Sequence, residues 1–477
     1  MKNELTFRPF SAMAHWAVLT LIWGFILIKA ALQFFLHYDT LAYHIPAALH
    51  AWGMTTYQPE PMLVDVINGI PPLAHWLQGA LIFLTGRMSA ANLINPLSLL
   101  GSAAIFHWLS PQKNAARWFL TLVLAVPMLV LHCLSSYIDL WSGSCLFVAF
   151  ITLAALQSER TSNAFSARKR LAVLAVCVLA LAAACNSKYQ AWPIVLVLGA
   201  WLLPFLLRAK PRRAAIALAV IGLMLGSYTP ARNYLRFGNP TFPISNPIFK
   251  SRAAFSSVDL GQTEALQRQM PEYLWEAPQW QRFGESVFEM NRLQSDSGTF
   301  RWSIDQAGGE QEWKSPNHRM GGWFWITVFL FILVCTRGLL RKVLPLSTGL
   351  MLLTCVVTAA LCPQSHELRY WLFLPLSAAG LSAWTLQSET QIWGTGFKLL
   401  FAAAAIYVCA AILSPFQIKS RPASAYAPEQ AVAFWNSQKK ESSSKVLSVC
   451  NAKPYAIFWS GPEFNSYRVQ DSGNAPQ

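Results

Sequence analysis

Runs of about twenty apolar residues recur along the whole 477-residue chain, separated by polar stretches. A helix needs about twenty mainly apolar residues to cross roughly 30 Å of hydrocarbon, so each run predicts one membrane-spanning helix. The first run is too long for a cleavable signal peptide and lacks a small-residue cleavage site. The pattern predicts eleven spans, at residues 12–36, 90–109, 116–134, 137–156, 170–186, 189–207, 213–230, 321–338, 343–361, 369–386 and 395–415.

One further apolar segment, residues 71–86, is short for a crossing and contains His75 and Gln78. If it crossed, the basic residues between 113 and 213 would fall outside, against the usual bias of Lys and Arg towards the cytoplasm. We therefore expect an interfacial or re-entrant helix here. A short external helix is expected just before it, at about 40–52.

Two polar stretches are too hydrophilic to cross, a loop at 235–320 and a tail at 416–477. The loop is rich in aromatic residues that suit sugar rings or an interfacial anchor: Tyr273, Trp275, Trp280, Trp302 and Trp313. The tail predicts one helix and two short strands, at 428–438, 445–450 and 455–459. The sequence thus predicts an all-α polytopic membrane protein of eleven to twelve transmembrane helices. Its membrane domain covers 1–415, with external loops at 38–70 and 235–320, and a small external α/β tail follows.

Composition agrees with a membrane protein, because 54% of the residues are hydrophobic and 12% are charged. A soluble domain carries about 25% charged residues. The net charge of +15 is explained by topology and not by nucleic acid binding, because sixteen basic residues and only three acids, Glu4, Glu159 and Glu389, fall in the predicted cytoplasmic segments. Those basic residues are Lys2, Arg8, Lys113, Arg117, Arg160, Arg168, Lys169, Arg170, Arg208, Lys210, Arg212, Arg213, Arg337, Arg341, Lys342 and Lys398.

Two acids stand where predicted helices meet the external surface. Asp39 follows the first span in the segment HYDTLAYHIP, residues 37–46, and Asp139 opens a later span in SSYIDLW. An ionisable group at a bilayer edge is a functional hypothesis by default, and a carboxylate can act as a general base. The alternatives are a solvated loop acid for Asp39 and a helix N-terminal acid, stabilised by the macrodipole, for Asp139.

Three cations, Lys188, Arg232 and Arg369, lie at external helix ends, where the bias of basic residues towards the cytoplasm makes them less expected. A phosphate or diphosphate would explain them, because Arg pairs with it bidentately and Lys acts as a point charge. The alternative is snorkelling to lipid headgroups. Glu367, two residues from Arg369, either pairs with it or orients it.

Several common signatures are missing from the sequence. There is no Walker A, GxGxxG or HExxH pattern, and no DxD-type metal pair in a plausible place. This argues against a nucleotide-driven pump and against a metal enzyme that uses a soluble nucleotide-sugar. No cofactor is predicted, and a divalent metal stays open without a motif to support it.

The order of the polar stretches resembles the membrane-embedded GT-C glycosyltransferases, the broad group that includes protein mannosyltransferases and the aminoarabinose transferase of lipid A. The stretches are YDTLAYHIPAALHAWG, PPLAHWLQGAL, SSYIDLW, NSKYQ, PARNYLRFGNPTFP and ELRYWLFLPL, spread from residue 38 to 376. The resemblance implies that Asp39 is the catalytic base and that Asp139 is a further acidic position of some members. It also puts Lys188 and Arg369 near the donor phosphate.

One departure concerns the segment Ile70-Pro71-Pro72, where the aminoarabinose transferases have a basic residue beside the proline. Contacts to the donor phosphate must then come from elsewhere in the chain. Further substrate-binding candidates lie around the matched stretches: Tyr43, His44, His75, Tyr189 and Glu367. A hydrogen-bonded or interfacial histidine is the alternative for His75.

The favoured function is transfer of a sugar from a polyprenyl-phosphate donor to a glycolipid, polysaccharide or protein acceptor. The partners are then that donor, the acceptor and membrane lipids, with no nucleic acid. The expected location is the bacterial inner membrane, with the site on the periplasmic face. Two alternatives remain, a transporter or flippase of a lipid-linked saccharide and a polymerase or ligase of surface glycans. A flippase predicts ionisable residues in the middle of spans, whereas the sequence gathers them at the external ends.

Overall fold

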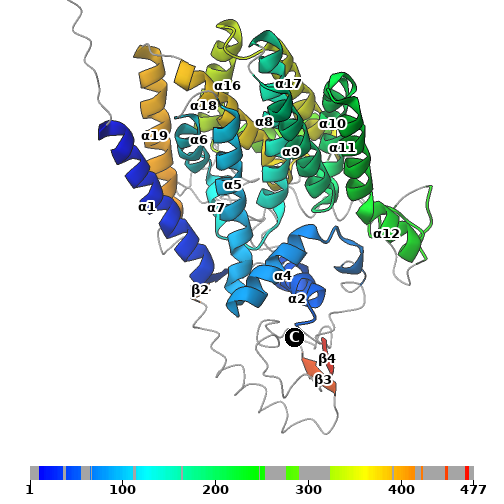
Figure 1. The fold of residues 1–477 in the computed structure, drawn as a ribbon. Coiled ribbons are helices and arrows are strands. Elements are labelled where there is room, and N and C mark those ends of the chain that lie inside the picture. The colour runs from blue at the N-terminus through cyan, green and yellow to red at the C-terminus, as the bar shows by residue number, and fades with distance from the viewer. Residues whose placement is uncertain are drawn as a thin grey trace, which may run out of the picture.

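A computed structural model describes residues 10–35, 39–54, 65, 67–110, 114–162, 165–245, 248–252, 276–288, 323–388 and 392–413, with strands at 420–422, 446–449 and 468–471. The described part is almost entirely helical (Figure 1). Its longer helices are α1 (Phe10–Leu32), α5 (Ile94–Leu109), α8 (Asp139–Ser162), α9 (Ala167–Cys185), α10 (Trp192–Arg208), α11 (Arg212–Gly226), α16 (Trp325–Leu340), α17 (Leu346–Leu361), α18 (Phe373–Ser388) and α19 (Ile392–Leu413). Shorter ones are α2 (Ile45–Ala51), α4 (Leu73–Thr85), α6 (Ala115–Leu124), α7 (Pro127–Cys133), α12 (Tyr228–Phe237) and α14 (Gln279–Phe288), with helical turns η1 (Thr40–His44), η2 (Met88–Leu93), η3 (Tyr189–Ala191) and η6 (Leu368–Trp371).

Each of the predicted spans overlaps a helix, although residues 33–35 at the end of the first form a strand, and the expected all-α polytopic membrane fold is confirmed. Among the described residues, five helices are long and apolar enough to cross a membrane by themselves, or six if one bent pair counts as a span. Shorter apolar helices of the described part lie at 73–85, 325–340, 346–361 and 394–410.

The predicted span at 116–134 is not one straight helix. It divides into α6 and α7, which are bent by 92° at a short break. Pro127 begins α7, and Val126 before it is extended, with φ −111° and ψ 109°. Proline lacks an N–H and disfavours helical geometry in the preceding residue, which explains the break.

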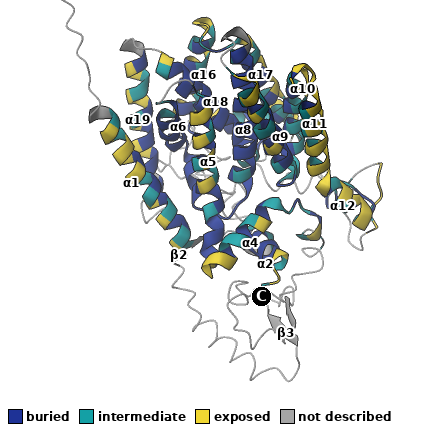
Figure 2. Cartoon of the chain, viewed as in Figure 1, coloured by how far each residue is buried: buried dark blue, intermediate teal, exposed yellow. Residues whose placement is uncertain are grey.

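Among the five candidate spans of the described residues, α8 is the most buried, since 94% of its apolar window is buried, against 11% for the span that contains α11. α8 packs against α5, α9 and α18, and lies inside the bundle, while α1 and α11 expose apolar faces (Figure 2). A Cβ on Gly380 would lie 2.7 Å from the Phe147 ring, so glycine permits the close contact between α18 and α8. The exposed apolar faces of the outer helices suit lipid.

α2 and α4 lie across one end of the bundle (Figure 1). α4 has 13 residues and is therefore about 20 Å long, which is short for a crossing, as expected. It ends at Gly86, whose φ of 66° is readily adopted only by glycine. α12 ends in the same way, at Gly238 with φ 73°.

Two small sheets complete the described part. β1 (Gln33–Phe35) pairs antiparallel with β2 (Ser420–Pro422), and β3 (Val446–Val449) pairs parallel with β4 (Arg468–Asp471). The predicted strand at 445–450 is thus found. The predicted helix at 428–438, the strand at 455–459, and His37 and Tyr38 lie outside the described residues, as do all the aromatic residues named for the large loop except Trp280, which is 63% exposed.

Candidate functional site

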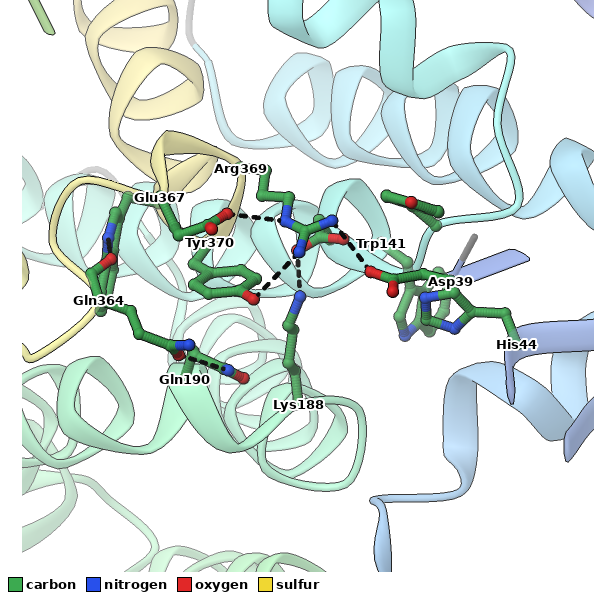
Figure 3. Close-up of polar contacts among 12 residues, drawn as sticks. Asp39, His44, Trp141, Lys188, Gln190, Gln364, Glu367, Arg369 and Tyr370 are labelled. Carbon is green, nitrogen blue, oxygen red and sulfur yellow. Dashed lines mark hydrogen bonds and ion pairs between the residues drawn. The ribbon is translucent and has the colours of Figure 1, made fainter. Parts of the chain in front are cut away.

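Five charged side chains from distant parts of the chain meet at the end of the bundle where α2 and α4 lie. Asp39 precedes η1, Asp139 begins α8, and Lys188 follows α9. Glu367 and Arg369 lie at η6, before α18. Figure 3 shows Asp39, Lys188, Glu367 and Arg369 pointing toward one another. Because the backbone at each position is fixed by the start or end of a packed helix, the cluster is held by the fold.

Arg369 is the centre of this cluster. Its Nη1 donates to Asp39 Oδ2 at 3.1 Å, its Nε donates to Glu367 Oε2 at 3.0 Å, and its Nη2 donates to the Tyr370 hydroxyl at 3.2 Å. The guanidinium also lies 5.3 Å from the centre of the Tyr137 ring. Burial opposes its charge, but Tyr370 and the carboxylates around it hold the pKa of Arg369 well above its ordinary value. Arg369 therefore stays charged and fixes the orientation of the Asp39 carboxylate.

Asp139 and Lys188 form the second ion pair of the cluster. The side chain of Asp139 is 1% exposed and that of Lys188 is 14% exposed. Lys188 also lies 4.0 Å from the centre of the Tyr370 ring, which is within cation–π range. Burial lowers the pKa of Lys188 below its ordinary value, and Asp139 partly offsets this. The buried pair makes Asp139 more than a solvated acid at a helix end.

The loop that carries Asp139 is fixed by Asn95 of α5. Asn95 Nδ2 donates to the carbonyls of His132, Ser135 and Tyr137, and its Oδ1 accepts the Trp141 N–H. Asn95 is fully buried. A single amide thus contacts four backbone groups between the end of α7 and the start of α8.

The charges of the cluster are unbalanced, since three carboxylates face two cations. Asp39 keeps 20% of its side chain exposed and Arg369 keeps 13%. Glu367 is only 3% exposed. Solvent therefore reaches Asp39, Lys188 and Arg369, whereas Glu367 is buried against Arg369.

The structure separates the other predicted residues into two groups. His44 and His75 are each 2% exposed and hydrogen-bond to each other, and Tyr43 lies beside them with its ring centre 4.3 Å from that of His44. Arg232 and Tyr189 lie apart from the cluster's described contacts. Arg232 donates to the carbonyls of Gly69 and Ile70, at 3.0 and 2.9 Å.

Tyr189 and Asn233 bind the same stretch of backbone before α4. The Tyr189 hydroxyl donates to the Gly69 carbonyl at 2.7 Å and also contacts the Phe242 carbonyl. Asn233 Nδ2 donates to the same two carbonyls, at 2.6 and 2.8 Å. These residues join the segment before α4 to the turn after α12.

Some residues of the site were not predicted from the sequence. Tyr370 contacts both cations, and its only signal was its position next to Arg369 in ELRYW. Gln190 Nε2 donates to Gln364 Oε1 at 3.1 Å beside the cluster, as Figure 3 shows. Nothing in the sequence indicated that pair. Within the part of the chain that is described, no three His, Cys, Asp or Glu side chains gather as metal ligands.

Comparisons with known proteins give structural matches only. No family model matches the chain. No curated protein matches it either. Solved structures with a similar course of the chain include the oligosaccharyltransferase of Archaeoglobus fulgidus in its apo form, with 14% identity, a TM-score of 0.49, and coverage of 96% of this chain and 64% of that one.

Two further solved structures are similar. The archaeal oligosaccharyltransferase AglB of Archaeoglobus fulgidus, in complex with an inhibitory peptide and a dolichol-phosphate, has 13% identity, a TM-score of 0.49, and coverage of 98% of this chain and 65% of that one. ArnT of Cupriavidus metallidurans, bound to undecaprenyl phosphate, has 14% identity, a TM-score of 0.43, and coverage of 96% and 85%.

The chain spans less than two thirds of the length of the archaeal chains it matches. The kinds of protein found agree with the family resemblance of the sequence. At this identity the likeness concerns the overall fold, and what each of those proteins binds is a property of that protein. The function proposed below rests on the residues of this chain.

Proposed function

We propose that this protein is a membrane glycosyltransferase that moves a sugar from a polyprenyl-phosphate donor to an acceptor, with its site on the external, periplasmic face of a bacterial inner membrane. The observation that carries the proposal is the contact of Asp39 with Arg369, at 3.1 Å, at the end of a bundle of apolar helices. A carboxylate that is oriented by a guanidinium and still reaches solvent is suited to general-base catalysis.

Asp39 takes the proton of the acceptor hydroxyl or amine in this proposal. The acceptor atom then bonds to the anomeric carbon of the sugar, and the bond from that carbon to the phosphate oxygen breaks. The released phosphate keeps the bonding electrons as added negative charge. Arg369 and Lys188, which retain 13% and 14% side-chain exposure, lie where they can stabilise that charge.

Phosphate binding has to compete with the carboxylates already present. Lys188 is paired with Asp139, and Arg369 is paired with Asp39 and Glu367. The donor phosphate would therefore add to these contacts at the exposed side of each cation. Arg232 is left out of this role, because its guanidinium is used by two backbone carbonyls.

A transporter or flippase of a lipid-linked saccharide is the second candidate. It would use ionisable groups along the translocation path. The described cluster lies instead at helix ends, where Asp139 is the first residue of α8 and Lys188 follows the last turn of α9. The position of the cluster favours chemistry at one surface.

The decisive test is Asp39→Asn, which keeps the shape of the side chain and removes the base. Sugar transfer in proteoliposomes should fall by about 10²–10⁴-fold, while binding of the lipid donor persists. Asp65→Asn is the matched control, because Asp65 is another described acid of the first external region that has no part in the cluster. If Asp39→Asn transfers sugar at the parent rate, Asp39 is not the base. If neither Asp39→Asn nor Lys188→Met affects transfer, the cluster is not the catalytic site.

A further inference from the structure

We propose that α4 positions the catalytic segment through a latch of five buried polar residues, Thr40, His44, His75, Gln78 and Ser136. This inference rests on the proposed function for the role of Asp39, and the latch itself is a structural claim that can be tested without it. His44 and His75 are then positioning residues and do not contact substrate. From the sequence, both were expected to bind substrate.

The first tie of the latch joins the two imidazoles. His44 Nδ1 lies 2.9 Å from His75 Nε2, and the rings stack with centres 5.2 Å apart. Each residue is 2% exposed. One nitrogen must donate and the other accept, so each ring uses the nitrogen that faces its partner. These two nitrogens are occupied by one another and are closed to a ligand.

The second tie runs through Ser136, in the turn before α8. Ser136 Oγ donates to Thr40 Oγ1 at 2.9 Å, and its carbonyl accepts from Gln78 Nε2 at 2.5 Å. All three residues are at most 1% exposed. Thr40 follows Asp39 directly in the chain, so this tie holds the backbone next to the proposed base.

The residues that form these hydrogen bonds lie on one face of η1 and on one face of α4. Thr40 and His44 are four residues apart on η1, and His75 and Gln78 are three residues apart on α4. Residues at these separations lie on one side of a helix, so α4 directs His75 towards His44 and Gln78 towards Ser136 from the same face. A Cβ on Gly79 would overlap the Trp52 ring, which shows how closely α2 packs on α4 next to the latch.

The same geometry explains why the latch would matter for catalysis. Asp39 must meet both Arg369 and the acceptor, and a misplacement of about 1 Å can cost about 10²-fold in rate. Arg369 contacts one oxygen of the carboxylate, at 3.1 Å. The latch fixes the backbone from which the carboxylate extends. A buried polar group that loses its hydrogen-bond partner destabilises the folded conformation around it. The segment that carries Asp39 would therefore shift or open when one of these hydrogen bonds is removed.

The experiment compares two variants of His75. His75→Gln keeps an amide near the position of Nε2, where it can donate to or accept from His44, and His75→Leu removes the tie. Ser136→Ala removes the second tie by deleting a single hydroxyl, and it decides the matter if His75→Leu does not purify as folded protein. Thr327→Val is the matched control, because it removes a buried hydrogen bond to the Ala125 carbonyl, 3.0 Å long, at a distant helix contact.

Two readouts are taken on each purified variant. The first is amide hydrogen exchange of residues 40–51, which requires no substrate. We expect roughly 10–100-fold faster exchange in His75→Leu and Ser136→Ala, and parent rates in His75→Gln and Thr327→Val. The second is sugar transfer, where kcat should fall about 10–100-fold in the two latch variants with an unchanged KM for donor.

Each outcome decides the inference. Parent exchange rates in both His75→Leu and Ser136→Ala would overturn the latch. Faster exchange with unchanged kcat would show a structural tie that does not position the base. A raised KM at constant kcat would return His75 to substrate binding. If no protein sample transfers sugar while the exchange pattern is as expected, the latch stands and the proposed function fails.

Discussion

Replacing Asp139 by Asn keeps the size of the side chain and removes the charge that faces Lys188. The ammonium of Lys188 then lies in a site where its side chain is 14% exposed, with no carboxylate in its described ion pair. Breaking a buried ion pair in this way costs about 3–5 kcal/mol. The Tyr370 ring, 4.0 Å away, offsets part of this as a cation–π partner, so the lower end is expected.

The double variant Asp139→Asn with Lys188→Met removes both charges at once. Replacing both partners by uncharged groups of similar volume is often close to neutral, so its free energy of unfolding should lie within about 2 kcal/mol of the parent. The two single variants and the double variant form a cycle whose coupling energy should exceed about 2 kcal/mol. The cycle separates the ion pair from other effects of each substitution.

Thermal unfolding in detergent, followed by tryptophan fluorescence, measures these differences. An entropy of unfolding of about 2.1 cal/mol/K per residue gives about 1 kcal/mol/K for 477 residues, so a cost of about 3 kcal/mol in Asp139→Asn should lower Tm by about 3 °C. A shift below about 1 °C would refute the reasoning. It would mean that Asp139 is a helix N-terminal acid whose charge contributes only through the macrodipole.

Three further predictions concern other parts of the molecule. Burial lowers the pKa of His75 to about 4. Burial, together with the neighbouring His75, Lys188 and Arg369, also holds the pKa of His44 well below its ordinary 6.5. The unfolded chain then binds more protons between about pH 6.5 and 4, so Tm should be highest above pH 6.5 and fall towards pH 4, less steeply in His75→Gln. Asn95→Ala should lower the free energy of unfolding by about 2 kcal/mol, measured by denaturant titration, because it removes the buried amide that contacts the carbonyls of Ser135 and Tyr137 and the N–H of Trp141. A periplasm-active reporter fused after Gln477 should be active, since eleven crossings from a cytoplasmic N-terminus put the tail outside. If a cytoplasmic reporter is active there instead, the number of crossings differs from eleven by one.

The positions of the helices could be predicted because the length of an apolar run is set by the thickness of the bilayer. The bend between α6 and α7 also had a sequence signal, since proline is favoured in the first turn of a helix and Pro127 begins α7. A search for hydrophobic length alone passes over that signal, because both halves are apolar. A proline inside an apolar run therefore predicts a helix break within a span, just as prolines between runs predict turns.

The membership of the site could be predicted in part. Asp39, Lys188 and Arg369 were singled out as charges at external helix ends, and they do meet, although Asp39 and Arg369 are 330 residues apart in the chain. The same criterion selected Arg232, which the fold uses to bind two carbonyls. The position of a charged residue at a membrane edge does not tell whether its side chain binds a ligand or a backbone carbonyl. That depends on which residues pack opposite the side chain in the fold.

The first and last spans are joined by a contact with a consequence for how the protein is made. Lys29, near the end of α1, donates from Nζ to the carbonyl of Leu413, the last residue of α19, at 3.0 Å. These residues are 384 positions apart, so ribosomes adding about 5–20 residues per second reach Leu413 about 20–80 s after Lys29. Through that interval the ammonium must be solvated at the bilayer edge or held by the insertion machinery. Arrival of α19 supplies this carbonyl and joins the last span to the first, while the 64 residues after Leu413 are still to be made.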